Sequence, residues 1–599
     1  LAGQTGTTAA SNTAVGYTAM SLNETGDFNT AVGREALQSN TTADNNVAVG
    51  YQALEENTTG TENVAVGTQA LDANTTASFN TAVGYNALGA NTTGADNTGI
   101  GRAALSNSTT GDDNTAVGKG ALAQNTTASS NTAVGTEALG LNTTGANNTG
   151  IGYIALSTNT TGSQNTAVGS FALGVATTAS YNSAFGYQAL DTNTTGNQNT
   201  AIGRRALYLN TTGSDNTAVG MNCMDSNTTG NYNVAMGQGA LNNQTTGSNN
   251  TIIGYTAGTS LTTGTEHVAL GSGTLGACTT TAGNVAIGYN ALNVCTAGST
   301  TAVGYEALGA CTSGVGNTAV GKDACQLTTT GSYNVAIGQL ALETNQTGSD
   351  NIAIGREALQ KCTVSDNTAV GYQCMEETTT GNHNTAIGHT SMDANTTGAY
   401  NAAVGKTSLG KVTTGDNNSA IGHTAGGNLT TGSNNIFIGH DAGITGSPGG
   451  NQSTGSNTIF VGDENISEAN IQVDWTVASD KRDKTDVEPL KTGLSFINKL
   501  EPVTYRWDKR SKYSDDQSVT PDGTHKQNWL DTGFLAQDVE KLEEEYGYKI
   551  EDKTNLTTTL SEDGEMYGLT YSKFVPSLVK AIQELSAEVE ELKSKLNEE

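Results

Sequence analysis

A short apolar motif recurs along most of the chain at a nearly constant spacing. The tripeptide Ala-Val-Gly, or a close variant, places glycines at positions 16, 33, 50 and 67, and the step of 17 residues continues unbroken to Gly288. Steps of 16 residues lead to Gly304 and to Gly371, and the series ends at Gly462 after a longer step. Such self-similarity at a fixed period is typical of a solenoid.

Each repeat position has a physical interpretation. The consensus is Asn-Thr-Ala-Val-Gly-Tyr-x-Ala-Leu-x-x-Asn-Thr-Thr-Gly-x-x. The alternation before the first Gly predicts a short strand, and Thr-Thr-Gly supplies turn residues. Apolar residues do not recur at helical spacing. We therefore predict a mainly β fold, a 17-residue-repeat β-solenoid or β-roll over residues 1–462. Each rung should be a flat coil of two short strands and two turns, stacked at ~4.8 Å.

The Asn of Asn-Thr-Thr has two interpretations. It matches the N-glycosylation sequon, and it also suits a buried ladder of side chains that cap neighbouring rungs. A surface sugar site would not normally alternate with apolar residues, so we favour the buried ladder. The apolar residues and cysteines that replace this Asn in other repeats are Ala176, Leu261, Val412, Leu429, Cys278, Cys295, Cys311 and Cys362.

The 7 cysteines are an odd number and lie at inward repeat positions. We expect small buried hydrophobes in a reducing compartment, without the CxxC clustering of a metal site. Cys278, Cys295 and Cys311 fall on adjacent rungs, so a disulfide between two of them stays open.

The position just after the strand glycine predicts an outward stripe, because Tyr, Arg, Lys and His alternate there. It is either a solvated face or a surface that contacts sugars, with Tyr51, Tyr85 and Tyr153 as candidate recognition residues. His423 and His440 fall on consecutive rungs, but two histidines are a weak case for a ligand set. We therefore expect no metal and no cofactor.

The repeats over residues ~10–462 resemble the head repeats of trimeric autotransporter adhesins, whose N-x-A-[VI]-G core builds left-handed β-rolls in trimers. No apolar run approaches the ~18 residues that span a bilayer, so we expect no membrane insertion. The net charge of −30, without clustered Lys or Arg, disfavours nucleic acid as a partner.

The composition changes after a junction at residues 463–478. All 3 tryptophans lie at or after it. The second segment, residues 479–599, opens with Ser-Asp-Lys-Arg-Asp-Lys, and Leu-Glu-Pro-Val, Tyr-Arg-Trp, Gly-Phe-Leu-Ala-Gln-Asp-Val-Glu and Leu-Thr-Tyr follow. Together these motifs closely resemble the C-terminal intramolecular chaperone domain of endosialidases, phage tail spikes and tail fibres. The resemblance implies a small α+β domain that trimerises a fibre and then cleaves itself.

The resemblance also implies a site. The scissile bond is Ala478–Ser479, Ser479 is the nucleophile, and Lys484 is the general base of a Ser/Lys dyad. Asp480 and Arg482 are supporting motif residues. A serine hydroxyl needs such a base, and a lysine serves only where burial or nearby cations disfavour its charge. The implied enzyme is a serine endopeptidase that acts once, in cis.

A final helix over 574–599 is predicted by heptad spacing. Its apolar seam is Leu578, Ile582, Leu585, Val589, Leu592 and Leu596. Ile or Val at one seam position with Leu at the other leans toward dimers in simple coiled coils. The resembled family trimerises, so we expect a homotrimer.

The leading hypothesis is a trimeric fibre or spike protein of a virion, assembled in the host cytoplasm, that binds a host-surface glycan or other receptor. Its C-terminal domain would direct trimerisation and leave by autoproteolysis before Ser479. The alternatives are a bacterial or other cell-surface trimeric adhesin, an ice-binding solenoid, and a polysaccharide-degrading tail spike. The last needs paired carboxylates in a cleft, whereas acidic residues of the repeats are scattered.

Overall fold

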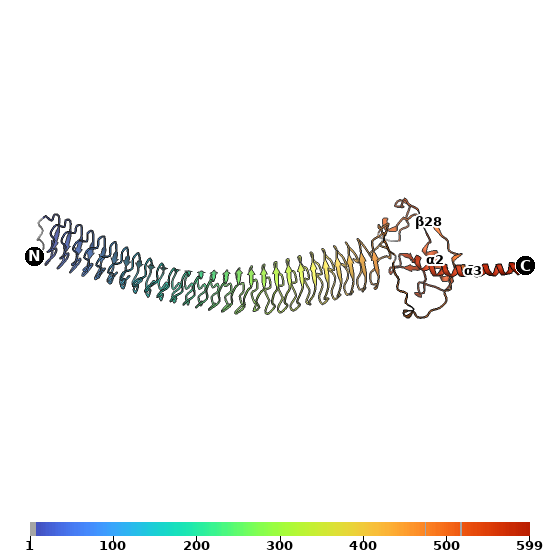
Figure 1. Cartoon of the computed structure of the whole chain (residues 1–599), viewed down its shortest axis with the longest axis horizontal. Coiled ribbons are helices and arrows are strands. Elements are labelled where there is room, and N and C mark those ends of the chain that lie inside the picture. Colours follow the sequence, from blue (N-terminus) through green and yellow to red (C-terminus); the bar gives the residue numbers. More distant parts are fainter. Residues whose placement is uncertain (1–7, 474, 515–517, 599) are drawn as a thin grey trace. The chain divides into compact units, whose positions relative to one another are not determined.

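The computed structural model describes residues 8–473, 475–514 and 518–598. The chain divides into two compact units, residues 1–333 and 334–599, and each contains rungs of the solenoid. The second unit also contains the C-terminal domain. Figure 1 shows the repeated rungs, each with one strand on the same side of its coil.

Every rung contributes one strand of three residues to a parallel sheet, paired in register with the strand of the next rung. In the first unit these are β1 (Thr13–Val15), β2 (Thr30–Val32), β3 (Val47–Val49), β4 (Val64–Val66), β5 (Thr81–Val83), β6 (Thr98–Ile100), β7 (Thr115–Val117), β8 (Thr132–Val134), β9 (Thr149–Ile151), β10 (Thr166–Val168), β11 (Ser183–Phe185), β12 (Thr200–Ile202), β13 (Thr217–Val219), β14 (Val234–Met236), β15 (Thr251–Ile253), β16 (Val268–Leu270), β17 (Val285–Ile287), β18 (Thr301–Val303) and β19 (Thr318–Val320).

The second unit continues the same pattern. Its solenoid strands are β20 (Val335–Ile337), β21 (Ile352–Ile354), β22 (Thr368–Val370), β23 (Thr385–Ile387), β24 (Ala402–Val404), β25 (Ser419–Ile421), β26 (Ile436–Ile438) and β27 (Ile459–Val461). The predicted β-solenoid with 17-residue spacing is confirmed.

The expectation of two strands per rung is wrong. The far side of each coil is a series of turns, because three positions that are not glycine adopt left-handed backbone conformations. In the rung that begins with β4 they are Gln69, Leu71 and Phe79, with φ of 56°, 53° and 63°. A left-handed residue reverses the local chain direction and cannot extend a strand. Backbone bonds between rungs still form there: the Leu71 N–H donates to the Ala87 carbonyl at 2.9 Å.

The glycine after each strand cannot be replaced without moving the neighbouring rung. Gly67 has a φ of 138°, and a Cβ built on it would lie 2.5 Å from the carbonyl oxygen of Gly84. Both the backbone conformation and the close approach require glycine at this position.

The interior of each rung is narrow and filled by small side chains. The middle strand residue points inward, as Ala65 does, and Ala70 and Leu71 are likewise buried. The large apolar residues at the two ends of the strand lie on the opposite, outward face. The repeat thus places its alanines inside and its valines and isoleucines outside.

Two ladders of buried asparagines complete the interior. In the first, the predicted one, Asn74 Nδ2 donates to the Ala77 carbonyl at 3.0 Å and to Asn57 Oδ1 on the preceding rung at 2.8 Å. In the second, Asn63 Oδ1 accepts from the backbone N–H of Asn80 on the next rung at 3.0 Å. The second ladder was missed by the sequence analysis. It satisfies one buried backbone donor in each rung, which would otherwise be costly.

The interior volume is conserved by paired changes. Ile252 replaces the usual inward Ala of a strand, and Gly258 replaces the usual Leu of the same rung. Near the end of the solenoid, Phe437 occupies the Ala position and a Cβ on Gly443 would lie 2.3 Å from its ring. A larger side chain on one wall therefore requires a smaller one on the other, as close packing demands.

All cysteines of the described chain are buried, as predicted, and all of them are free. Cys295 Sγ lies 3.9 Å from Cys311 Sγ, so these two side chains are in contact without a bond. Burial raises the pKa of the Cys223, Cys325 and Cys374 thiols to about 12.

The C-terminal domain is small and aperiodic. Its elements are the 3-10 helix η1 (Lys481–Asp483), α1 (Leu494–Ile497), β28 (Val503–Tyr505), η2 (Arg510–Lys512), β29 (Asp531–Gly533), α2 (Ala536–Glu545), β30 (Thr558–Leu560), β31 (Tyr567–Leu569), η3 (Tyr571–Lys573) and α3 (Phe574–Glu598). β28 pairs with β29, and β30 with β31, both antiparallel. The core is a cluster of Phe496, Val539, Leu542 and Phe574.

The long helix α3 is largely unpartnered in the single chain. Its N-terminal part packs into the domain core through Phe574 and Ala581. The heptad seam beyond it is exposed, from Leu578 at 44% to Leu596 at 76%. None of the helices in the described part of the chain combines the length and apolar character that crossing a bilayer requires.

Candidate self-cleavage site

The predicted cleavage site lies at the start of the C-terminal domain, in a stretch that is exposed throughout. A single turn of 3-10 helix, η1, begins directly after Asp480. The Asp480 side chain caps this turn by accepting a hydrogen bond from the Arg482 backbone N–H at 2.9 Å. The motif therefore encodes its own local fold, since an Asp at this position satisfies an otherwise free donor.

Asp480 and Arg482 also form an ion pair. The Arg482 guanidinium lies 2.6 Å from the Asp480 carboxylate, and Arg482 Nε donates to the same group at 3.0 Å. The hydrogen bonds from Arg482 lower the pKa of Asp480, and the pKa of Arg482 is raised in turn. The arginine is thereby occupied by its motif partner, and both residues hold the turn rather than the reacting atoms.

The turn brings Ser479 and Lys484 together from its two ends. Lys484 Nζ lies 2.6 Å from Ser479 Oγ. This is the distance over which a proton can pass between an amine and a hydroxyl. The two residues that the sequence motif suggested as nucleophile and base are in hydrogen-bond contact.

One requirement of a Ser/Lys dyad is not met by the single chain. An amine becomes a base at neutral pH only where burial or neighbouring cations disfavour its charged form. Lys484 is exposed, as are Ser479 and the remaining motif residues. The local sequence supplies the geometry of the pair, and a working dyad would need surfaces outside this turn to protect it from water.

The predicted outward stripe is exposed in the described rungs. Tyr51, Tyr85 and Tyr153 show 40%, 57% and 50% of their surface. Side chains of this stripe contact neighbouring rungs: the Arg34 guanidinium lies 5.6 Å from the Tyr51 ring centroid, and the Tyr153 ring meets the ring of Phe171, one position beyond the stripe, edge to face at 5.4 Å. These contacts are local, because small polar residues such as Thr68, Thr136 and Ser170 separate the aromatic side chains along the stripe.

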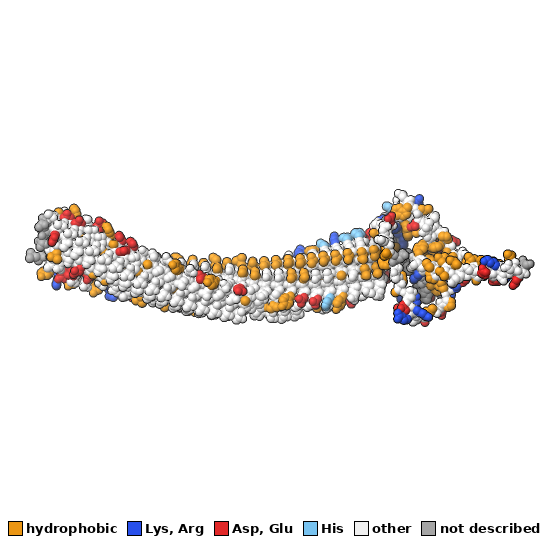
Figure 2. Space-filling view, in the orientation of Figure 1, with side chains coloured by type: hydrophobic (Ala, Val, Ile, Leu, Met, Phe, Trp, Pro, Cys, Tyr) orange, Lys and Arg blue, Asp and Glu red, His pale blue; other side chains and the backbone are white. Residues whose placement is uncertain are grey.

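A second exposed surface was missed by the sequence analysis, because its residues were expected to shape the strand and not to face water. The outward ends of the strands form apolar rows along the rungs, as Figure 2 shows. In the first unit they include Ile100, Phe185, Ile202, Met236 and Leu270, and in the second Ile354, Ile387, Ile421, Ile438 and Val461. Single exposed apolar side chains are ordinary on a protein surface, whereas rows of them are unusual.

The chain combines a parallel β-solenoid with a small C-terminal domain of short strands and helices. Residues 479–548 match the family described as chaperone of endosialidase. The resemblance seen in the sequence is thus confirmed for these residues, and the match begins at Ser479 itself. No curated protein matches the chain.

Proposed function

We propose that the protein is a trimeric fibre or spike of a virion, whose C-terminal domain directs assembly and is then released by cleavage before Ser479. The observation that carries this proposal is the chaperone-of-endosialidase match, which begins at Ser479 and follows a β-solenoid. The 2.6 Å contact between Lys484 Nζ and Ser479 Oγ supports the cleavage step.

The chemistry proposed for cleavage is an acyl shift followed by hydrolysis. Ser479 Oγ attacks the carbonyl carbon of Ala478 while neutral Lys484 takes the hydroxyl proton. The C–N bond then breaks as Lys484 passes the proton to the Ser479 nitrogen, which leaves Ala478 esterified to Ser479 Oγ. Water hydrolyses this ester to the Ala478 carboxylate and restores the serine hydroxyl.

Three copies explain the two unpartnered apolar surfaces. The exposed seam of α3 suits a coiled coil with the helices of other copies. The outward strand rows of each unit suit packing of rod against rod, which buries the valines and isoleucines that face water in one chain. Assembly through α3 would also cover the exposed turn at residues 479–484, and burial there would disfavour the charge on Lys484.

A register problem explains why a repetitive rod would carry such a domain. Successive rungs present nearly the same face, so a slip of one rung between two copies costs little locally. An aperiodic domain that trimerises first fixes the register. Removal of the domain after assembly prevents the trimer from separating by the reverse of its assembly pathway. The outward stripe with Tyr51, Tyr85 and Tyr153 stays available to a host-surface glycan or other receptor.

The test is the size of the freshly expressed chain and of three variants. The wild type should give fragments 1–478 and 479–599, without added protease and at a rate independent of protein concentration once assembled. Ser479→Ala and Lys484→Ala should leave the full-length chain, still trimeric by light scattering. Lys481→Ala is the matched control, since it removes a neighbouring cation outside the Ser479–Lys484 contact, and it should slow cleavage at most.

Cleavage of Ser479→Ala at the same bond would show that the dyad is wrong and that another protease acts. A stable monomer of the wild-type chain would exclude the trimeric fibre, whatever the cleavage result.

A further inference from the structure

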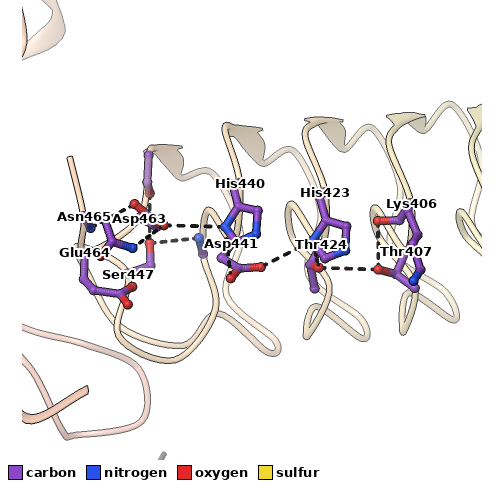
Figure 3. Close-up of polar contacts among 12 residues, drawn as sticks. Lys406, Thr407, His423, Thr424, His440, Asp441, Ser447, Asp463, Glu464 and Asn465 are labelled. Carbon is purple, nitrogen blue, oxygen red and sulfur yellow. Dashed lines mark hydrogen bonds and ion pairs between the residues drawn. The ribbon is translucent and has the colours of Figure 1, made fainter. Parts of the chain in front are cut away.

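The last rungs of the solenoid place imidazole and carboxylate groups in one ladder. His423 follows β25, His440 follows β26, and Asp463 follows β27, all directly after the strand glycine. Asp441 takes the next position beside His440. Figure 3 shows these four side chains on one edge of consecutive rungs, with Lys406 at the same position one rung earlier.

The four groups are close enough to share an ion. The His423 and His440 rings stack with centroids 5.1 Å apart and an angle of 9°. His440 Nδ1 lies 3.1 Å from Asp441 Oδ2 and 3.5 Å from Asp463 Oδ2, and His423 Nδ1 lies 4.0 Å from Asp441 Oδ1. One potential ligand atom each from His423, His440 and Asp441 lies within 4.8 Å of the others.

These separations suit a tetrahedral ion. Zinc bonds of ~2.0–2.1 Å to nitrogen and oxygen separate neighbouring ligand atoms by roughly 3.4 Å. The distances at His440 already have this value, and rotation of the half-exposed His423 ring can close the remaining gap. The charges also match, because two carboxylates balance a divalent cation and imidazole is the ligand that zinc, nickel and copper prefer.

Asp463 is held in place before any ion arrives. Its carboxylate accepts from the Asn465 backbone N–H at 2.9 Å and from Asn465 Nδ2 at 2.8 Å. A fixed carboxylate beside a ligating histidine is the arrangement that orients ligands in metal sites.

We propose that His423, His440 and Asp441 bind one divalent transition-metal ion of the zinc type, with Asp463 as a further ligand or as the group that orients His440. This goes against the expectation of no metal, which rested on the two histidines alone. The spacing did not identify Asp463, at the ladder position of the next rung, as part of a site. It did not identify Asp441 either, whose backbone is left-handed with a φ of 54°.

The place of the site gives it a structural role. Each rung pairs only with its neighbours, so local unfolding of a solenoid starts at its terminal rungs. The regular 17-residue step ends here, since Thr430 Oγ1 donates to the carbonyl of Ser453, which lies 23 residues further along the chain. An ion held by residues of two consecutive rungs would clamp the terminal turns. This inference is independent of the proposed virion function and of cleavage.

The experiment is a zinc titration of the tag-free protein, expressed as the whole chain and used as purified, after treatment with a chelator. We expect one Zn²⁺ per chain by calorimetry. His423→Ala, His440→Ala and Asp441→Asn should each weaken the Kd more than about 100-fold, which exceeds the usual cost of losing an outer-shell partner. Asn tolerates the left-handed backbone at position 441, so this variant tests the ligand and not the fold.

The matched control is His389→Ala. His389 has the same ladder position on an earlier rung, where its ring packs against Tyr372 at 5.0 Å, and its loss should leave the zinc Kd unchanged. Zn²⁺ should also slow hydrogen exchange of the amides in residues 419–462 in the wild type but not in His440→Ala.

Cobalt distinguishes this site from the buried thiols. Co²⁺ should give the absorption of a tetrahedral N/O site, without a thiolate-to-metal charge-transfer band. That band would assign the ion to Cys278, Cys295 or Cys311 and overturn the proposal. So would zinc binding that persists in His423→Ala and His440→Ala, or the absence of binding in the wild type at millimolar Zn²⁺.

Discussion

The solenoid and the C-terminal domain solve the problem of stability in opposite ways. Each interior rung supplies the environment of the next one, through strand pairing, buried asparagines and stacked leucines. The C-terminal domain has one small cluster around Phe496 and Phe574, and its longest helix exposes an apolar seam. The solenoid is locally self-sufficient, whereas the domain leaves the apolar seam of its longest helix exposed in the single chain.

The two regions also differ in how far their contacts specify a unique pairing. Neighbouring rungs are nearly interchangeable, so contacts within the solenoid say little about which rung should meet which in another copy. The domain contains unrepeated contacts, such as the buried Thr492 hydroxyl 2.7 Å from that of Ser577, and these can form in only one way. A periodic rod therefore benefits from an aperiodic end that fixes its register.

The largest effect should come from the seam of α3. Ile582→Glu together with Leu585→Glu places charges at the centre of the proposed coiled coil, and should abolish the trimer at micromolar protein. Light scattering measures the change, and circular dichroism should show that the rungs of each chain are retained. Lys593→Glu, outside the seam, is the control and should stay trimeric. If the double variant remains trimeric, the solenoid and not α3 holds the copies together.

Thiol reactivity should separate the interior of the solenoid from its surface. The native cysteines should label at least about a thousand times more slowly than after unfolding, because a reagent reaches them only when rungs open. The raised pKa of Cys223, Cys325 and Cys374, about 12, lowers the thiolate fraction further at neutral pH. An introduced cysteine at exposed Tyr85 is the control and should react at once. Fast labelling of the native cysteines would contradict the buried ladder.

The two asparagine ladders should differ in cost. Asn199 Oδ1 accepts the Asn216 backbone N–H at 3.0 Å, so Asn199→Ala leaves a buried donor unpaired and should destabilise its rung by about 2–3 kcal/mol. Asn193 belongs to the other ladder, in which Ala176 already holds the same position on the preceding rung. Asn193→Leu should therefore cost less, about 1 kcal/mol. Hydrogen exchange of amides in the affected rungs measures both. Equal costs would mean that the ladders are equivalent.

The smallest expected effect tests whether the interior volume of a rung is conserved. Ile252→Ala should cost about 2–3 kcal/mol and Gly258→Leu about 1–3 kcal/mol, through a cavity and through overpacking. The double variant restores the consensus residues at these two positions and should recover most of both losses, since Gly258 has a φ of 58°, close to the values of the leucines it replaces. Additive losses in a double-mutant cycle would show that the two positions do not share one space.

Much of the candidate site could be predicted from the sequence because it is local. Ser479, Asp480, Arg482 and Lys484 lie within one turn, and a capped 3-10 turn brings its ends together without help from the rest of the chain. The environment that would make Lys484 a base could not be predicted in the same way. It depends on surfaces that no local pattern contains, and the single chain leaves the turn exposed.

The sequence by itself determined the period, the parallel solenoid, the buried Asn-Thr-Thr ladder and the cysteine interior, because a repeat forces each residue type into a column whose substitutions reveal its environment. Only the tertiary structure decided that each rung has one strand, that valine and isoleucine face outward, and that a second asparagine ladder binds backbone. It also decided that Asp441 and Asp463 join His423 and His440. These outcomes depend on left-handed turns at residues such as Leu71, and a left-handed leucine follows from the stacking of neighbouring rungs and not from its own preference.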